Sequence, residues 1–562
     1  MIPVNEALWT QSKANRLSPR FEQKYNNIVQ QFFSRDPRHW PIFQIAELGD
    51  LVTRRRSLHP HSNVSMADRL ETEATIPLTS SDAATPFDPL ALYAANMSKN
   101  WEDPASVENV VSTPSDPAIH GALLATIANP NLVSRQYAGG AVELEQVVIR
   151  QIANLVGYDD KKATGLFTQG GTFCNLYGYL LGIRKAFPDS SVNGLSNHSF
   201  CMMNSEAGHY SNMTDLALMG ISINKQVMRV RVNRDNQIDV EDFERRMKEC
   251  IQKGIKVPTI LLTCGTTDTF AIDDVEAIYR IKEELCYRYN LSYKPHIHVD
   301  AAVGWSLMFF NSYNFEANPL DINPATLHGL DSIMPKVRAL KYADSITIDF
   351  QKWGYVPYTS SMIIIKNGKD MEALKQDPNY FSYFEPRMKE ASHLQSTIEC
   401  SRSAVGVFSA YSALSYIGIE GFQLLISNCM QNANYLRYLL STQDHCRVVS
   451  ASNQGPSVTF RLYHPQSKED PYELFDEERR VVNDEFFDSE ANHAAYHRKN
   501  FIARKGRCLH TNWVESIAHT DYNSFGNCLY LPGEKAVFFN PHTTRDQIQE
   551  FVEHLYFHRH RI

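Results

Sequence analysis

Between about residues 90 and 370 the chain alternates short runs of β-branched and apolar residues with longer segments whose apolar residues recur at helical spacing. Side chains repeat every two residues in a strand and about every 3.6 in a helix, so the short runs predict strands and the longer segments predict helices. The predicted strands are Thr164–Thr168, Ser199–Met203, Val227–Val232, Thr259–Thr263, His296–Asp300, Ser345–Phe350 and Ser361–Lys366. The helices predicted between them include Phe173–Ala186, Val240–Lys253 and Val275–Tyr289. This alternation favours an α/β fold with a mainly parallel, doubly wound sheet.

The segments on either side of this region have different patterns. Residues before about 90 contain a helical pattern from Phe21 to Phe33 and end in a polar stretch, Thr72 to Pro86. Beyond about residue 370, helical patterns occur at Ser403–Leu414 and Thr544–Phe557. The charged segment from Gln466 to Glu490 predicts a surface insertion. We therefore expect an N-terminal helical arm with a linker (1–89), a large domain (90–370) and a smaller C-terminal domain (371–562).

Composition and charge narrow the classes of function. The 562 residues carry a net charge of -8, so no overall positive field attracts nucleic acid or an anionic membrane. The chain has no run of about 18 apolar residues, and its first residues lack the apolar core of a secretory signal. The ten cysteines form no C-x-x-C pair and no Cys/His metal spacing, which favours free thiols in a reducing compartment. We expect a soluble cytoplasmic protein without a bound metal.

A glycine pair lies between a predicted strand and a predicted helix. Gly170 and Gly171 let the backbone approach a ligand closely, and the helix start offers free N–H groups and the positive end of a dipole. Thr172 adds a hydroxyl group. Phosphate suits this arrangement, although a purely structural strand-to-helix turn is the alternative interpretation.

The segment HVDAA, residues 298–302, stands at the end of another predicted strand. Asp300 could be a helix cap or a metal ligand. A third use is specific to a pyridine cofactor, because a carboxylate facing the ring nitrogen keeps it protonated and makes the ring an electron sink. Ala302 is small enough for a flat ring to lie against the backbone.

Lys352 follows a third predicted strand and is flanked by Gln351, Trp353 and Gly354. An isolated lysine at the end of a strand is usually a solvated surface residue. Here a phosphate cradle, a carboxylate suited to a ring nitrogen and an amine follow one another, each at the carboxyl end of a predicted strand. Ligands of doubly wound sheets bind at these ends, so the three motifs predict one cofactor site.

As an ordered set, the motifs GGTFCN, SEAGHYS, GTT and HVDAA with the Lys352 segment resemble the group II pyridoxal-5′-phosphate (PLP) dependent amino-acid decarboxylases. That family includes glutamate, aromatic-amino-acid and tyrosine decarboxylases. The similarity runs from about residue 115 to 420, and a weaker similarity occurs at Phe538–Pro541. The resemblance implies PLP fold type I (aspartate-aminotransferase-like), a C-terminal α+β domain and a homodimer.

The resemblance also implies a role for individual residues. Lys352 would carry PLP as a Schiff base, Asp300 would pair with the ring nitrogen, and His209 would stack on the ring. The remaining cofactor contacts would come from Gly170, Gly171, Thr172, Thr266, Thr267, Ala302 and Gln351. Arg402 matches an arginine that grips the substrate's carboxylate in the family's glutamate decarboxylases, a task that suits the guanidinium fork. A surface or interdomain salt bridge is the alternative for Arg402.

Two positions depart from the family pattern. The family usually has His before the Schiff-base lysine, whereas this chain has Gln351, which can donate a hydrogen bond to phosphate but cannot carry charge. The family's mobile loop often supplies a Tyr as proton donor, and the matching stretch, roughly 385–397, has none. His393 lies inside that stretch, and Tyr380 and Tyr383 lie just before it, so these three are the candidate donors.

The function expected from these residues is decarboxylation of an L-amino acid, acidic or aromatic, to the amine and CO₂. Glutamate, aspartate and tyrosine are examples of such substrates. Which bond stands perpendicular to the cofactor ring decides the reaction, so other outcomes stay open. They are a different PLP carbon–carbon lyase, an aldehyde synthase, and a catalytically silent homologue that binds a partner.

Overall fold

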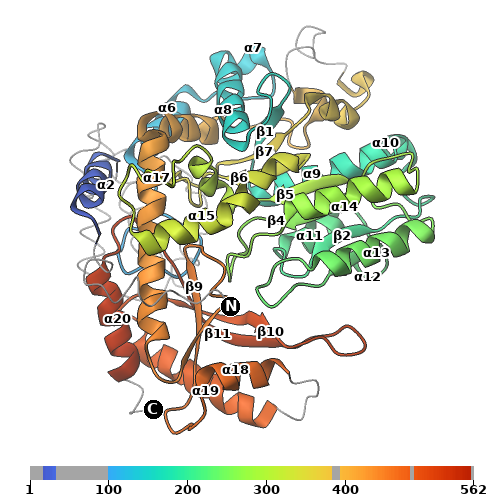
Figure 1. Ribbon diagram of the computed structural model, residues 1–562. Coiled ribbons are helices and arrows are strands. Elements are labelled where there is room, and N and C mark those ends of the chain that lie inside the picture. The colour runs from blue at the N-terminus through green and yellow to red at the C-terminus, as the bar shows by residue number, and fades with distance from the viewer. Residues whose placement is uncertain (1–16, 33–98, 382–392, 481–486, 558–562) are drawn as a thin grey trace, which may run out of the picture.

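The computed structural model describes residues 17–32, 99–381, 393–480 and 487–557 (Figure 1). Two sheets organise this part of the chain, and a long helix, α17 (Val405–Ser441), packs against helices next to the larger sheet and against strands of the smaller one. All ten cysteines are free thiols. Among the described residues, none of the helices combines the length and apolar character needed to span a membrane.

The larger sheet has seven strands in the order β1-β7-β6-β5-β4-β2-β3. Strands β2 to β6 pair in parallel, and β7 runs antiparallel to both β1 and β6. The predicted α/β fold with a mainly parallel sheet is therefore confirmed. The strands are β1 (Thr164–Thr168), β2 (Met202–Ser205), β3 (Val227–Val230), β4 (Thr259–Thr263), β5 (His296–Asp300), β6 (Ser345–Asp349) and β7 (Ser361–Ile365).

Most predicted strand limits agree with the structure to within one residue, and β2 and β3 are the exceptions. β2 begins at Met202, three residues later than predicted, because regular pairing with β3 starts only there. The preceding Phe200 makes a single isolated bridge to Lys256. β3 ends at Val230, and Val232 pairs instead with Ile238 in the turn before the next helix.

Helices cover the sheet, and two of them begin at aspartates that cap them. Asp239 accepts hydrogen bonds from two N–H groups at the start of α13, and Asp274 accepts one at the start of α14. These helices are α6 (Asp116–Ala128), α7 (Arg135–Ala138), α8 (Gly140–Val156), α9 (Gly171–Ala186), α10 (Ser190–Asn193), α11 (Ser211–Leu218), α12 (Ile223–Gln226), α13 (Val240–Gln252), α14 (Val275–Arg288) and α15 (Pro324–Arg338). The 3-10 helices are η2 (Gly304–Phe310), η3 (Ala339–Tyr342), η4 (Gly368–Leu374), η5 (Pro378–Phe381) and η6 (His393–Ser396).

The helical pattern at Ser403–Leu414 is the start of the much longer α17. This helix of 37 residues bends at Gly418, whose φ of 69° and ψ of 176° interrupt the helical backbone. α2 (Pro19–Phe32) packs on α17, which ties the N-terminal helical pattern to the middle of the chain.

The smaller sheet is antiparallel, in the order β10-β11-β9-β8. Its strands are β8 (Cys446–Val449), β9 (Ser457–Leu462), β10 (Asn512–His519) and β11 (Tyr530–Val537), and its helices are α18 (Pro471–Arg479), α19 (Phe487–Arg504) and α20 (Arg545–Phe557). The prediction that Gln466–Glu490 is a surface insertion is wrong for the part that forms α18. Leu474 and Phe475 belong to the core of this sheet, and Glu478 forms a buried ion pair with Arg461. The domain boundaries at 89/90 and 370/371 stay predictions.

Candidate active site

The start of α9 forms an open cradle after β1. Gly170 has φ of 145° and ψ of 163°, a conformation that only glycine adopts readily. No side chain caps this helix of 16 residues, so the N–H groups of its first turn are available to a ligand. A Cβ atom at Gly171 would lie 2.8 Å from both carboxylate oxygens of Asp349, so glycine is needed here for close approach.

Lys352 lies in the turn between β6 and β7, beside this cradle. Its Nζ atom is 3.0 Å from Oδ2 of Asp349, and its side chain is 18% exposed. Burial lowers the pKa of Lys352, but the negative charges of Asp349 and Asp300 outweigh burial and raise it overall. The amine is therefore held as an ammonium group that is paired with Asp349 and lies within the field of Asp300.

Asp300 ends β5, and both of its carboxylate oxygens are held by this chain. Oδ2 accepts a hydrogen bond from Nδ2 of Asn175 at 2.9 Å, and Oδ1 accepts one from the Ala302 N–H at 3.1 Å. Asp300 does not cap η2, whose first flanking residue is Val303. Among the described residues no group of three or more His, Cys, Asp or Glu side chains could hold a metal ion.

His209 lies between β2 and α11, half-buried. Its Nδ1 atom accepts a hydrogen bond from the Ser211 N–H at 3.3 Å and lies 2.8 Å from the Ser211 hydroxyl. Burial lowers the pKa of His209, Asp300 opposes this, and the positive charge of Lys352 adds to it. His209, Asp300 and Lys352 thus share one electrostatic environment, at the carboxyl ends of three strands of the sheet.

Three residues of this environment were missed by sequence reasoning. Asp349 is buried, and it accepts a hydrogen bond from the Ser361 hydroxyl as well as pairing with Lys352. The motif GGTFCN contains Asn175, one helical turn after Gly171, and that spacing could have placed it beside the cradle. Tyr358 lies six residues after Lys352 and is 57% exposed; partial burial raises the pKa of its hydroxyl overall, and the charge of Lys352 acts in the opposite direction.

Arg402 is engaged elsewhere. Its guanidinium group donates to both carboxylate oxygens of Glu145, at 2.5 and 3.2 Å, and to the carbonyl oxygen of Phe167 at 3.1 Å. Arg402 is 4% exposed and Glu145 is 1% exposed. The guanidinium fork therefore grips a carboxylate of its own chain, so the geometry gives no support to a role with the substrate carboxylate and favours the salt-bridge alternative.

The side chains of Gln351 and Thr266 also form hydrogen bonds with residues close to them in the chain. The amide of Gln351 donates to the Ser361 hydroxyl at 2.8 Å and accepts from the Ser360 N–H at 3.0 Å. Gln351 therefore holds the start of β7, and the geometry gives no support to its expected contact with phosphate. The hydroxyl of Thr266 accepts from the Ala271 N–H at 2.9 Å and closes the turn after β4.

The candidate proton donors lie in different surroundings. His393 begins η6. Burial lowers the pKa of His393, and the charges that also act on this pKa are those of Glu145, which raises it, and Arg402, which lowers it. The charges of Asp300 and Lys352 are not among those that act on His393. Tyr380 is 72% exposed. Tyr383 lies outside the described residues.

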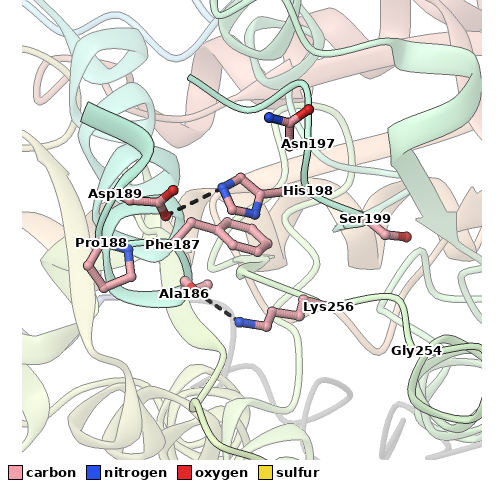
Figure 2. A pocket seen from close by; sticks show the side chains of 9 residues that line it. All are labelled: Ala186, Phe187, Pro188, Asp189, Asn197, His198, Ser199, Gly254 and Lys256. Atoms are coloured by element: carbon pink, nitrogen blue, oxygen red, sulfur yellow. Dashed lines mark hydrogen bonds and ion pairs between the residues drawn. The ribbon is translucent and has the colours of Figure 1, made fainter. Parts of the chain in front are cut away.

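A separate hollow of about 310 Å³ lies at the amino ends of β2 and β4, away from the ends where Lys352 and Asp300 lie (Figure 2). Several of its polar side chains have partners within the hollow. His198 lies 3.4 Å from Asp189, and Lys256 donates to the carbonyl oxygen of Ala186 at 3.1 Å. The ammonium of Lys256 also lies 4.8 Å from the centre of the Phe187 ring. His198 and Lys256 are therefore both in contact with other residues that line the hollow.

Comparison with known proteins gives consistent results. The profile of the pyridoxal-dependent decarboxylase conserved domain matches residues 91–463. The aspartate 1-decarboxylase of Aliivibrio fischeri is 26% identical over 347 residues, and the match covers 57% of each chain.

Solved structures with the same fold include the Oryza sativa TDC with PLP and tryptamine, with a TM-score of 0.71, 16% identity and coverage of 94% of this chain and 98% of that chain. Mouse CSAD in apo form has a TM-score of 0.68 at 16% identity and covers 92% of this chain and 99% of its own. These similarities show that the fold is PLP fold type I.

Proposed function

Since the chain belongs to the pyridoxal-dependent decarboxylase family, we propose that it is a carboxy-lyase that converts an L-amino acid to the amine and CO₂ with PLP as cofactor. One observation carries the proposal. The ammonium of Lys352 lies 3.0 Å from Asp349, within the field of Asp300, and beside the uncapped start of α9. An amine, a carboxylate and a phosphate cradle are the three groups that PLP requires.

The residues present fit the cofactor. The free N–H groups at Gly170, Gly171 and Thr172 would bind its phosphate, because no side chain of this chain occupies the cap of α9. Lys352 would bind its aldehyde carbon covalently, and Asp300 would hold a proton on the ring nitrogen. When bound, PLP supplies an electron sink for the bond that breaks at Cα.

The surrounding residues would fix the cofactor's plane. His209 would cover one face of the ring, and the small, buried Ala302 would let the other face lie against the backbone. Thr266 and Thr267 follow β4 at the same edge of the sheet. They would contact the cofactor through their backbone, because the hydroxyl of Thr266 already accepts a hydrogen bond within its own turn.

The substrate is proposed to be an acidic or aromatic L-amino acid. Aspartate is the first candidate, because the curated relative aligned over 347 residues is an aspartate 1-decarboxylase. Tryptophan-like substrates come next, because the Oryza sativa structure contains tryptamine. The pocket geometry does not favour one class, since Arg402 is already paired with Glu145.

The proposal is tested by incubating the purified protein with PLP and each of the twenty amino acids in air. CO₂ release with one equivalent of amine from an acidic or aromatic substrate supports it. Stoichiometric aldehyde, ammonia and hydrogen peroxide would identify an aldehyde synthase instead. A protein that binds PLP but releases no CO₂ from any amino acid would contradict decarboxylation.

A further inference from the structure

Behind Asp300, the face of β5 that lies under α9 is polar. His296, His298 and Asp300 alternate along β5 and so project to the same face of the sheet, and all are at most 7% exposed. On the neighbouring strand β6, Ser345 lies beside His298 in the pairing register. Two imidazoles in the middle of a sheet are costly to bury unless each is hydrogen-bonded.

α9 packs across this face and supplies both ends of a hydrogen-bonded chain (Figure 1). Asn175 lies near its start and Lys185 near its end. Gly178 lies between them, and a Cβ atom there would come within 2.4 Å of the His298 ring. The helix can therefore approach the His298 ring closely only because this position has no side chain.

The chain of hydrogen bonds is continuous from the far edge of the sheet to Asp300. Its successive links are Lys185 Nζ to His296 Nδ1 (3.4 Å), His296 Nε2 to Ser345 Oγ (2.7 Å), Ser345 Oγ to His298 Nδ1 (2.7 Å), His298 Nε2 to Asn175 Oδ1 (3.0 Å) and Asn175 Nδ2 to Asp300 Oδ2 (2.9 Å). Lys185, the first residue of this chain of hydrogen bonds, also forms an ion pair with Asp370 at 2.8 Å.

The two ends determine the direction of every link. An ammonium group can only donate, so Nδ1 of His296 accepts from Lys185. A carboxylate can only accept, so the Asn175 amide donates to Asp300 and its own oxygen accepts. Thr347 lies beside the last histidine, donates to the same Asn175 oxygen at 2.7 Å and preserves this direction.

The two histidines fit the chain as neutral rings. Burial lowers the pKa of His296 to about 3 and lowers the pKa of His298 well below its ordinary value. A neutral imidazole has one donor and one acceptor, which is what each histidine needs here. Both rings are then protonated at Nε2, and every donor in the chain points towards Asp300.

We propose that this relay is a positioning device for the cofactor: Lys185 acts through His296, Ser345, His298 and Asn175 to hold Asp300 as an oriented anion facing the ring nitrogen. The inference rests on the proposed function, because it assigns Asp300 to that nitrogen. Hydrogen bonds in a chain polarise one another, so the cation at the far edge strengthens the last bond to the carboxylate. One oxygen of Asp300 is thereby occupied, and its proton-accepting power is reduced, which leaves the proton on the ring.

The first test uses the cofactor-free protein, so its outcome does not depend on catalysis. Solid-state ¹⁵N NMR of histidine-labelled protein, with His296→Gln and His298→Gln for assignment, should show both rings neutral and protonated at Nε2. Protonation of either ring at Nδ1 would reverse a link and overturn the relay. Failure of the proposed function would instead appear as PLP that does not attach to Lys352, with the NMR result unaffected.

The second test removes the cation at the head of the chain. Lys185→Met should move the ¹⁵N signals of both His296 and His298, shift the visible absorption of bound PLP, and weaken PLP binding by roughly 2- to 10-fold, the value of one lost hydrogen bond. Lys185→Arg should restore most of these properties.

The matched control is Lys256→Met, because Lys256 also donates to the end of α9 but belongs to no link of the chain. It should leave all three measurements unchanged. The relay is wrong if Lys185→Met moves only the His296 signal, or if Lys256→Met changes the cofactor spectrum as much as Lys185→Met does.

Discussion

The Nζ atom of Lys352 and Oδ2 of Asp349 lie 3.0 Å apart, three residues from each other at the carboxyl end of β6. A side chain at Gly171 would clash with the carboxylate of the same Asp349. The pair therefore connects the proposed Schiff-base lysine to the phosphate cradle. It also keeps Lys352 protonated, so Lys352 would have to lose a proton and its ion pair with Asp349 before its amine could bind PLP covalently.

Lys352 is predicted to be the residue that binds PLP covalently. Borohydride reduction of the holoenzyme followed by peptide mapping should place the pyridoxyl group on it. Lys352→Ala should lower kcat by roughly 10³-fold or more, because the covalent attachment is lost, while PLP still binds through its phosphate. A label on a different lysine would contradict the assignment.

Asp300→Asn is predicted to lower kcat by roughly 10²- to 10³-fold, because the amide retains the shape but not the charge that keeps the ring nitrogen protonated. The visible spectrum of bound PLP should change with it. Asp331→Asn, an exposed position on α15, is a matched control that should leave kcat and the spectrum as in the wild type. Near-normal turnover of Asp300→Asn would mean that another group protonates the ring.

The buried pair of Glu145 and Arg402 is predicted to stabilise the fold. Glu145→Gln leaves the guanidinium without its counter-charge and should lower the free energy of unfolding by about 3–5 kcal/mol, measured by urea denaturation. Replacing Glu145 and Arg402 together by Leu and Met should cost less than the single change. If Arg402→Lys instead raised KM by orders of magnitude with unchanged stability, Arg402 would be a substrate-binding residue.

The same pair predicts a pH dependence of stability. Burial raises the pKa of Glu145, but Arg402 outweighs burial and lowers it overall. The carboxyl group therefore contributes stability that is fully present above its unfolded pKa of about 4.3 and is lost as the pH falls through the lower folded value. In acid denaturation, Glu145→Gln should flatten this part of the stability profile, and an unchanged slope would argue against the pair.

Tyr358 is predicted to be the acid that protonates Cα after CO₂ leaves, because it follows Lys352 by six residues and the Lys352 charge acts on its hydroxyl, whereas the charges that act on His393 are those of Glu145 and Arg402. Tyr358→Phe should lower the rate of amine formation by roughly 10²-fold and increase aldehyde and hydrogen peroxide in air. His393→Gln is the comparison and should retain amine as the main product. If His393→Gln lost more amine formation than Tyr358→Phe did, His393 would be the proton donor.

The protein is predicted to be a homodimer, as the family resemblance implies and as closed oligomers most often are. Light scattering of the holoenzyme should give twice the mass of the chain. A fully active monomer would contradict this.

Residue patterns were enough to predict the α/β alternation, the limits of β1, β4 and β5, and the ordered motifs at the ends of the strands. Such features depend on periodicity and on residues close together in the chain, which a sequence displays directly. Gly170 and Gly171 could be interpreted for the same reason, because a glycine pair between a strand and a helix is a local signal.

The tertiary structure alone decided which charged groups meet. Arg402 pairs with Glu145, 257 residues away, and Lys185 reaches His296, 111 residues away. No local pattern specifies such partners, because they depend on how helices pack on the sheet and on which polar groups burial forces together. The hydrogen-bond partners of Arg402 and Gln351 therefore followed from their packing, since a buried polar side chain binds whichever partner is available to it there.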